Sequence, residues 1–258
     1  MSVAYFERLD ATRFRATAHT SGAWREDEQH ISPAIGLLAH LVERDRAARR
    51  DDDLVLARLS YDILGTVPVD DVTTDVRVVR PGRTIELVEA TMAHAGRVVL
   101  VLRAWLLEPR DTRAVAGTAL RAIPGPDELE PWTPSDTWPG GFIGSVELRR
   151  HLEEPGRGWF WVRTGVPLLA DEPVGPTARF AGLLDLANGM TVRADPALVH
   201  FPNVDLTAHL LREPVGEWLG VDVSISFGDT GVGVTSSVLH DTSGPLGSLA
   251  QSLTVRPR

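Results

Sequence analysis

The order of apolar and polar positions along the chain predicts the same series of elements twice. Residues 33–49 carry leucines at helical spacing, and residues 176–190, PTARFAGLLDLANGM, carry a second helical pattern. Each helix follows strand-like segments and precedes four segments that alternate between apolar and polar positions. The predicted strands of the first copy are 12–20, 54–64, 72–80, 83–93 and 97–107, and those of the second copy are 142–152, 158–165, 197–212, 217–227, 231–240 and 246–255.

Both copies are expected to be antiparallel, because short turns and no helices connect their last four strands. Each run of four strands is therefore predicted to be a meander. An apolar sheet face must be covered, and each copy offers one helix for that purpose. We expect an α+β fold in which two curved antiparallel sheets each wrap around a central helix. Ser32, before Pro33, is the predicted N-cap of the first helix.

The segment between the two copies differs from both in composition. Residues 108–141 are rich in proline and acidic side chains, which is typical of a connection between domains. We predict an N-terminal unit at 1–110, a linker at 111–141 and a C-terminal unit at 142–258. Trp132 and Trp138 indicate that the linker lies against the body of the protein.

Composition and charge exclude several kinds of protein and site. The 258 residues carry a net charge of −9, which argues against a nucleic-acid or anionic-membrane partner. The absence of cysteine excludes disulfides, thiolate nucleophiles and cysteine-bound metals. The eight histidines have no spacing typical of metal ligands, so neither a metal nor a cofactor is predicted. With no signal-peptide core and no apolar run of membrane length, the sequence predicts a cytoplasmic protein.

The second helix carries one acid, Asp185, in a stripe of small residues. Small residues at spacings of three and four let another backbone approach, and an acid on that side would lie close to it. Val42 occupies the matching position of the first helix, so the sequence predicts one acidic site per chain. An ordinary surface or capping acid near a helix end is the alternative interpretation of Asp185.

The longest motifs resemble one family of enzymes. GPTARFAGLLDLANGM, HFPNVDLTAHLLREPVGEWLGVDV and GPLGSLAQSLTVRP, in a tandem arrangement, resemble the double hotdog acyl-CoA thioesterases, and in particular the thioesterase II-like branch common in actinobacteria. QHISPA and VVRPGRTIELVEA extend the resemblance to the first copy. The resemblance implies a tandem hotdog fold, an acyl-CoA substrate and lipid metabolism. It leaves the assembly open between a monomer and a homo-oligomer of double hotdog protomers.

The resemblance also implies site residues. In that family an Asp of the second helix, a Ser or Thr of the next strand and a Gln near the C-terminus hold the attacking water. The matching positions are Asp185, Asn203 and Gln251, so an amide stands where the family has a hydroxyl. Thr207 offers a hydroxyl, since it shares a strand face with Asn203 and Asp205. Without the resemblance, Asn203 is equally typical of a turn, and Gln251 of an outward-facing strand position.

Substrate-binding groups are predicted at the ends of the helices. Backbone N–H groups at a helix start, either 31–34 or 174–177, could stabilise an oxyanion. Arg179 and Arg212 are candidates for the phosphates of CoA, and Gly175 and Gly189 are candidates for close approach of the substrate.

Three functions follow from these observations. The leading one is hydrolysis of acyl-CoA by a water that Asp185 and Gln251 orient, without a covalent intermediate, because the chain has neither Cys nor a G-x-S-x-G motif. A hotdog enoyl-thioester hydratase or dehydratase is the second, although the helix carries no His beside its acid. A catalytically inactive acyl-CoA-binding protein is the third, because Asn203 replaces the expected hydroxyl.

Overall fold

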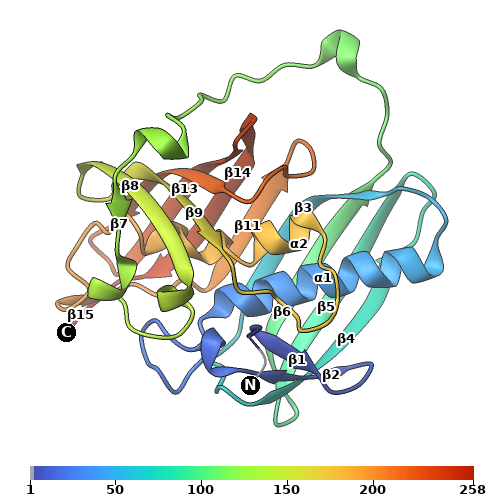
Figure 1. Cartoon of the computed structure of the whole chain (residues 1–258), viewed down its shortest axis with the longest axis horizontal. Coiled ribbons are helices and arrows are strands. Elements are labelled where there is room, and N and C mark those ends of the chain that lie inside the picture. The colour runs from blue at the N-terminus through green and yellow to red at the C-terminus, as the bar shows by residue number, and fades with distance from the viewer. Residues whose placement is uncertain (1–2) are drawn as a thin grey trace.

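The computed structural model describes residues 3–258, and in it the two copies share one continuous antiparallel sheet (Figure 1). The strand order is β1-β2-β4-β5-β6-β3-β11-β14-β13-β12-β9-β8-β7. The order β2-β4-β5-β6-β3 is repeated in reverse as β11-β14-β13-β12-β9, so an approximate two-fold axis passes between β3 and β11. The predicted α+β class is confirmed.

The elements are bounded as follows. The first half contains β1 (Phe6–Arg8), β2 (Arg13–Ala16), α1 (Ile31–Arg49), β3 (Val55–Ile63), β4 (Asp71–Arg80), β5 (Ile85–His94) and β6 (Arg97–Leu107). The second half contains β7 (Pro131–Trp132), β8 (Val146–Glu154), β9 (Arg157–Thr164), α2 (Pro176–Ala181), the 3₁₀ helix η6 (Leu184–Asn188), β11 (Asp205–Leu210), β12 (Leu219–Phe227), β13 (Val232–Asp241) and β14 (Gly244–Thr254). A separate two-stranded ribbon consists of β10 (Val199–His200) and β15 (Arg256–Pro257).

The predicted meanders are correct for three strands of each half and wrong for the fourth. Strands β4, β5 and β6 are consecutive neighbours, as are β12, β13 and β14. Strands β3 and β11 instead lie on the far side, beside β6 and β14, and pair with each other at the centre. The pairing places Ser60 opposite Thr207, with their hydroxyl oxygens 2.8 Å apart. This central ladder joins the two half-sheets by backbone hydrogen bonds.

Both helices differ from the sequence prediction at one end. Helix α1 begins at Ile31, and its N-cap is His30, whose Nδ1 accepts a hydrogen bond from the Ser32 N–H. Ser32 is therefore not the N-cap. Pro33 is tolerated at the third helical position because first-turn N–H groups have no intrahelical acceptor.

The predicted helix over 176–190 is broken. Helix α2 ends at Ala181 with Gly182 as its C-cap, and the chain continues as the 3₁₀ helix η6. Glycine is a poor helix former, and here it lies at the contact with α1. The tighter 3₁₀ turn changes the direction of the side chains after Gly182, Asp185 among them.

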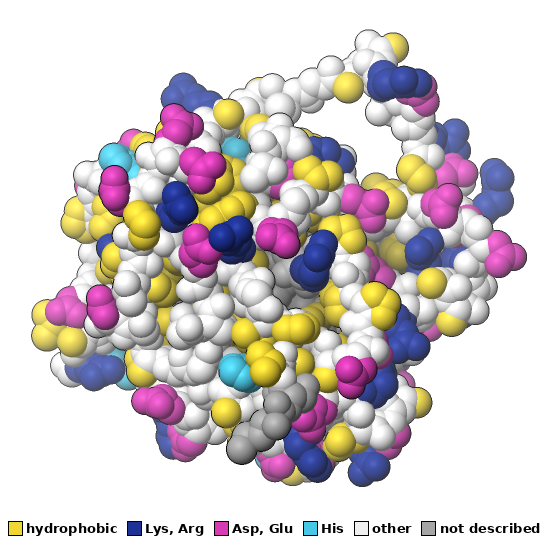
Figure 2. Space-filling model, viewed as in Figure 1, with side chains coloured by type: hydrophobic (Ala, Val, Ile, Leu, Met, Phe, Trp, Pro, Cys, Tyr) yellow, Lys and Arg dark blue, Asp and Glu magenta, His cyan; other side chains and the backbone are white. Residues whose placement is uncertain are grey.

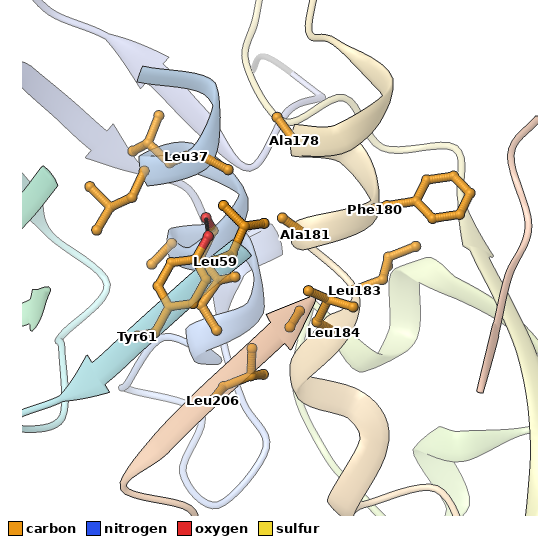
Figure 3. Packing of buried hydrophobic residues seen from close by; sticks show 14 of the residues in the cluster. Leu37, Leu59, Tyr61, Ala178, Phe180, Ala181, Leu183, Leu184 and Leu206 are labelled. Carbon is orange, nitrogen blue, oxygen red and sulfur yellow. Dashed lines mark hydrogen bonds between the residues drawn. The ribbon is translucent and has the colours of Figure 1, made fainter. Parts of the chain in front are cut away.

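The two helices approach closely through small residues, as the sequence predicted. A Cβ atom on Gly36 of α1 would lie 2.9 Å from the Cα of Gly182. Ala178 and Ala181 point toward α1, whereas Phe180 points away from it (Figure 3). The surrounding cluster is buried and apolar, and it includes Leu37, Leu38, Leu59, Tyr61, Leu183, Leu184 and Leu206.

Part of the connecting segment packs on the body and part does not. Trp138 is buried and donates its Nε1–H to the carbonyl oxygen of Gly189 at 2.9 Å. Trp132 is half-buried, with the Arg150 guanidinium 3.5 Å from its ring centroid. The expectation that both tryptophans lie against the body is confirmed, although the exposed chain over 109–119 arches away from it (Figure 1). Within the described residues, no helix combines the length and the hydropathy that crossing a membrane requires.

Replacing Gly36 by Ala tests the helix contact. The new methyl group would meet Gly182 Cα at 2.9 Å and the Ala178 carbonyl at 3.0 Å, both backbone atoms. We expect the free energy of unfolding, measured in urea, to fall by about 1–3 kcal/mol, because overpacking outweighs the better helix propensity of alanine. Gly144→Ala is the control, since a Cβ there meets no atom within 4 Å. Equal stability of the two variants would contradict the close contact.

Candidate functional site

Three of the predicted site residues meet at the Asp185 carboxylate. Asp185 lies on η6 and is 7% exposed. Its Oδ1 accepts hydrogen bonds from Asn203 Nδ2 at 2.7 Å and from Gln251 Nε2 at 3.2 Å. Within residues 3–258 no hydrogen bond uses its other oxygen, Oδ2. One oxygen is thus fixed by two amides, and the other remains available.

Local patterns explain how two distant segments reach Asp185. Gln251 takes an inward position on β14 between Leu249 and Leu253, which are also buried, so the alternative of an outward-facing polar residue is wrong. Asn203 lies before β11 and forms an isolated bridge with Leu253. Because it stands outside the regular strand, its side chain does not follow the alternation of β11 and turns to Asp185.

The prediction that Thr207 shares a face with Asn203 is wrong. Within β11 the buried side chains are Leu206 and Ala208, so Thr207 points to the opposite face, where it bonds to Ser60. Asp205 also points away from Asp185 and accepts a hydrogen bond from the Ser252 N–H at 2.5 Å. Neither Thr207 nor Asp205 brings its side chain to the carboxylate.

Burial changes the protonation of Asp185. Desolvation raises its pKa to about 7, against the opposing effect of the hydrogen bonds from Asn203 and Gln251. His30 lies nearby, with its Nδ1 3.9 Å from Asp185 Oδ2. Burial lowers the pKa of His30 to about 3, so its imidazole is neutral and does not form an ion pair with the acid. A carboxyl with a pKa near 7 can exchange a proton at physiological pH.

Asp185 lines a cavity of about 290 Å³, and the residues at the start of α1 line the same cavity. The Ser32 N–H is used by His30 Nδ1 and Pro33 has none, whereas no hydrogen bond in residues 3–258 uses the Ile31 N–H. Of the two predicted oxyanion sites, 31–34 therefore lies beside the acid. The other lies at a separate cavity of about 460 Å³, which Asp185 does not line. The residues around the smaller of these cavities include Gly22, Ala23, Trp24, Arg25, Glu28, Gln29, His30, Ile31, Ile63, Leu64, Val67, Asp185, Pro202 and Asn203.

The four predicted substrate-binding residues lie in three places. Gly189 is close to the site, because it lines a cavity of about 30 Å³ that Asp185 also lines. Gly175 is the N-cap of α2, and Arg179 lines the 460 Å³ cavity. Arg212 forms a two-point ion pair with the fully buried Asp241, so its guanidinium is already occupied.

Surface charge adds no further anchor for the phosphates of CoA on the viewed face. Basic and acidic side chains are interspersed there (Figure 2). Within the part of the chain that the structure describes, no group of three or more His, Asp and Glu side chains could hold a metal ion.

Sequence reasoning missed two aromatic residues of the site, His30 and Trp24. Both come from the first half, and both line the cavity that contains Asp185. The QHISPA motif placed His30 next to a helix start, but nothing in the sequence indicated which half that helix start would face. The packing of the two halves against each other places His30 of the first half beside Asp185 of the second half.

Two family models match the chain. A model described as the acyl-CoA thioesterase C-terminal domain matches residues 126–255, and one described as the acyl-CoA thioesterase N-terminal domain matches residues 20–107. Among proteins with curated descriptions, none matches the sequence.

Solved structures resemble the whole chain. A hot dog fold protein of unknown function from Alicyclobacillus acidocaldarius is 14% identical, with a TM-score of 0.75, over 100% of this chain and 96% of its own. The acyl-CoA thioesterase II TesB2 of Mycobacterium marinum is 18% identical, with a TM-score of 0.68, over 99% and 97%. The tesB protein of Mycobacterium avium subs paratuberculosis is 16% identical, with a TM-score of 0.66, over 98% and 96%. These likenesses confirm the predicted double hotdog fold.

Arg212→Ala tests whether this arginine has a structural role. Removing it would leave the fully buried Asp241 carboxylate without its ionic partner. We expect the free energy of unfolding to fall by about 3 kcal/mol or more in chemical denaturation. Arg113→Ala is the control, since that residue pairs with Asp111 in solvent and its loss should be nearly neutral. A stable Arg212 variant with weakened CoA binding would instead support the phosphate-binding prediction.

Asp185→Asn tests the cost of burying the acid. The pKa of Asp185 is raised by folding from 3.8 to about 7, so the folded state binds more protons than the unfolded state between these values. Stability supplied by the protonated acid is present at low pH and is lost as pH rises through about 7. We expect the free energy of unfolding of Asp185→Asn, relative to the wild type, to rise by about 3 kcal/mol between pH 5 and pH 7 in urea unfolding and to level off above pH 7. The exposed Asp229→Asn should show no such gain, and a pH-independent difference for Asp185→Asn would contradict the raised pKa.

Proposed function

The chain belongs to the acyl-CoA thioesterase family and is a thioester hydrolase, and we propose that it cleaves acyl-CoA with a water molecule that Asp185 deprotonates. This mechanism rests on the different surroundings of the two oxygens of the Asp185 carboxylate. Oδ1 accepts from Asn203 and Gln251, whereas no hydrogen bond of the described chain uses Oδ2, and Asp185 lines the cavity of about 290 Å³. An acid held by one oxygen keeps its other oxygen in a fixed position for proton transfer.

The hydrolysis proceeds in two balanced steps. The water oxygen attacks the thioester carbonyl carbon while Asp185 Oδ2 takes one water proton, and the carbonyl oxygen becomes an oxyanion. The carbon–sulfur bond then breaks as the oxyanion returns to a carbonyl, and the departing thiolate takes up the proton. The products are a carboxylic acid and the free thiol of CoA. No enzyme-bound acyl group forms.

Ile31 is the proposed oxyanion donor. Its backbone N–H lies in the first turn of α1, beside His30, and has no acceptor among residues 3–258. A helix start concentrates N–H groups and partial positive charge, which stabilises a developing negative charge. His30 supports this helix start by accepting the Ser32 N–H, and its neutral ring adds no competing charge.

The two amides have separate roles in this proposal. Asn203 Nδ2 donates to Asp185 Oδ1 and to the carbonyl oxygen of Asp205 at 3.1 Å, so both of its N–H groups are used. Asn203 is therefore a positioning residue for the acid. Gln251 Oε1 is buried and has no partner within the described residues, so it is available to accept a hydrogen bond from the second O–H of the attacking water.

Asp185→Asn should abolish most of the activity while keeping the fold. We expect kcat/KM for thiol release from acyl-CoA to fall by about 10²–10⁴-fold, since a general base is removed. In the wild type, kcat/KM should rise with pH through about 7 and then level off, because the base works when Asp185 is ionised.

Glu43→Gln is the matched control for this experiment. Burial also raises the pKa of Glu43 to about 7, but its carboxylate lies against Gly175 at the start of α2, away from Asp185. Its replacement should leave the activity and the pH profile unchanged. Tight acyl-CoA binding by the wild type with no thiol release at any pH would favour the binding-protein alternative.

A further inference from the structure

Three buried polar groups lie on the inner face of the second half-sheet without hydrogen-bond partners. Thr235 of β13 is 0% exposed, Gln251 of β14 is 1% exposed, and Ser237, the next inward residue of β13, is 5% exposed. Within residues 3–258 no hydrogen bond uses Thr235 Oγ1, Ser237 Oγ or Gln251 Oε1. Buried polar atoms in proteins nearly always have a partner, so three of them together call for a physical reason.

The equivalent strands of the first half do not carry such a group. The approximate two-fold axis relates β13 and β14 to β5 and β6. Glu86, at one end of β5, is paired with Arg49 and Arg50. The other inward residues of β5 and β6 are buried and apolar: Val88, Ala90, Met92, Leu100, Leu102, Ala104 and Leu106. The unpartnered polar groups therefore occur in the half that carries Asp185, which indicates a role at that acid.

Thr235 and Gln251 are direct neighbours across the β13–β14 ladder. Residues opposite each other in an antiparallel pair have Cβ atoms about 4.5–5.5 Å apart. A rotation of the Thr235 side chain, or one internal water molecule, therefore suffices to join its hydroxyl to the Gln251 amide. The 3₁₀ helix η6, which carries Asp185, packs on β13, so the pair lies beneath the acid.

The orientation of the Gln251 amide matters for the acid. Nε2 donates to Asp185 Oδ1 at 3.2 Å, an arrangement that suits an ionised carboxylate. A protonated carboxyl group can instead donate to Oε1, which favours the reversed amide. Because burial raises the pKa of Asp185 to about 7, both forms of the acid are populated near neutral pH. A donor at Gln251 Oε1 would stabilise the orientation that serves the ionised base.

We propose that Thr235 is a positioning residue: its hydroxyl donates to Gln251 Oε1, directly or through one internal water molecule, and so keeps the Nε2–H on Asp185. A carbonyl oxygen has two lone pairs, so this bond leaves one for the attacking water. Thr235 lines neither cavity beside Asp185 and acts through Gln251 without touching the substrate. The inference rests on the proposed function, because it takes Asp185 as the base.

Thr235→Val tests the proposal, because valine keeps the shape of threonine and removes the hydroxyl. Weaker donation from Gln251 destabilises the ionised form of Asp185, so the midpoint of the pH profile of kcat/KM should rise by about 0.5–1 pH unit with KM unchanged. Thr235→Ser keeps a hydroxyl and should restore the wild-type midpoint. An unchanged midpoint in Thr235→Val overturns the proposal, and Thr235→Ala replaces it in the comparison with Thr235→Ser if the valine variant does not fold.

The pH readout reports on Asp185 because the other charged groups around it stay the same in these variants. His30, Arg25 and Glu28 line cavities together with Asp185. Burial keeps His30 neutral by lowering its pKa to about 3, and Arg25 pairs with Asp27. The inward side chains of β13 over 233–239 and of β14 over 246–253 carry no charge.

A double-mutant cycle shows whether Thr235 acts through Gln251. Gln251→Leu removes the amide and should raise the midpoint of the pH profile by itself. In the Gln251→Leu background, Thr235→Val should add no further shift, since its target is gone. Two shifts that simply add would mean that Thr235 acts by another route, which overturns the proposal.

Thr191→Val is the matched control for loss of a buried hydroxyl. Thr191 is 0% exposed and its Oγ1 has no partner within the described residues, but it does not belong to the β13–β14 ladder. Its replacement should leave the midpoint unchanged. A shift as large as that of Thr235→Val would assign the effect to a general change in packing and would overturn the proposal.

An NMR titration of the Asp185 carboxyl carbon separates failure of this inference from failure of the proposed function, because it needs no turnover. If the wild type releases no thiol from any acyl-CoA, the proposed function fails. A higher pKa of Asp185 in Thr235→Val than in the wild type and Thr235→Ser still supports Thr235 as the residue that positions Gln251. Equal pKa values in the three proteins overturn it.

Discussion

The pairing of β3 with β11 is the interaction on which the rest of the molecule depends. It joins two half-sheets into one surface, and on that surface the helices meet at Gly36 and Gly182 with no side chain between them. Because the halves are fixed so closely, an acid of the second half reaches a helix start of the first half. The candidate site belongs to neither half alone, and any change that separates the central strands or the helices separates its parts.

A second constraint is electrostatic. Asp185 is buried and receives two amide hydrogen bonds within the described residues, both on one oxygen, so its ionised form is poorly solvated. A better solvated carboxylate would be more stable and a weaker base. Burial of Asp185 thus lowers the stability of the fold at neutral pH and raises the basicity of the carboxylate.

Most strands and the principal site residues could be predicted from the sequence, because alternation and family motifs are local signals. Asp185, Asn203 and Gln251 were correctly grouped by the resemblance, and the structure brings them together. The side of β11 on which Thr207 lies could not be predicted. Asn203 precedes the regular strand, so its side chain does not follow the alternation of side chains within β11. The neighbour His30 could not be predicted either, because its position depends on how two distant segments cross. The helix break at Gly182 reflects tertiary contact rather than propensity alone.

The covalent tandem has a consequence that two identical subunits could not achieve. In a symmetric pair every substitution appears twice, so an acid placed on one helix would appear on the other and both charges would be buried. In this chain the two halves differ: the second half provides the acid and its amides, and the first half provides the helix start and His30. A covalent tandem therefore lets each half provide a different part of one site, which two identical subunits could do only by carrying every part twice.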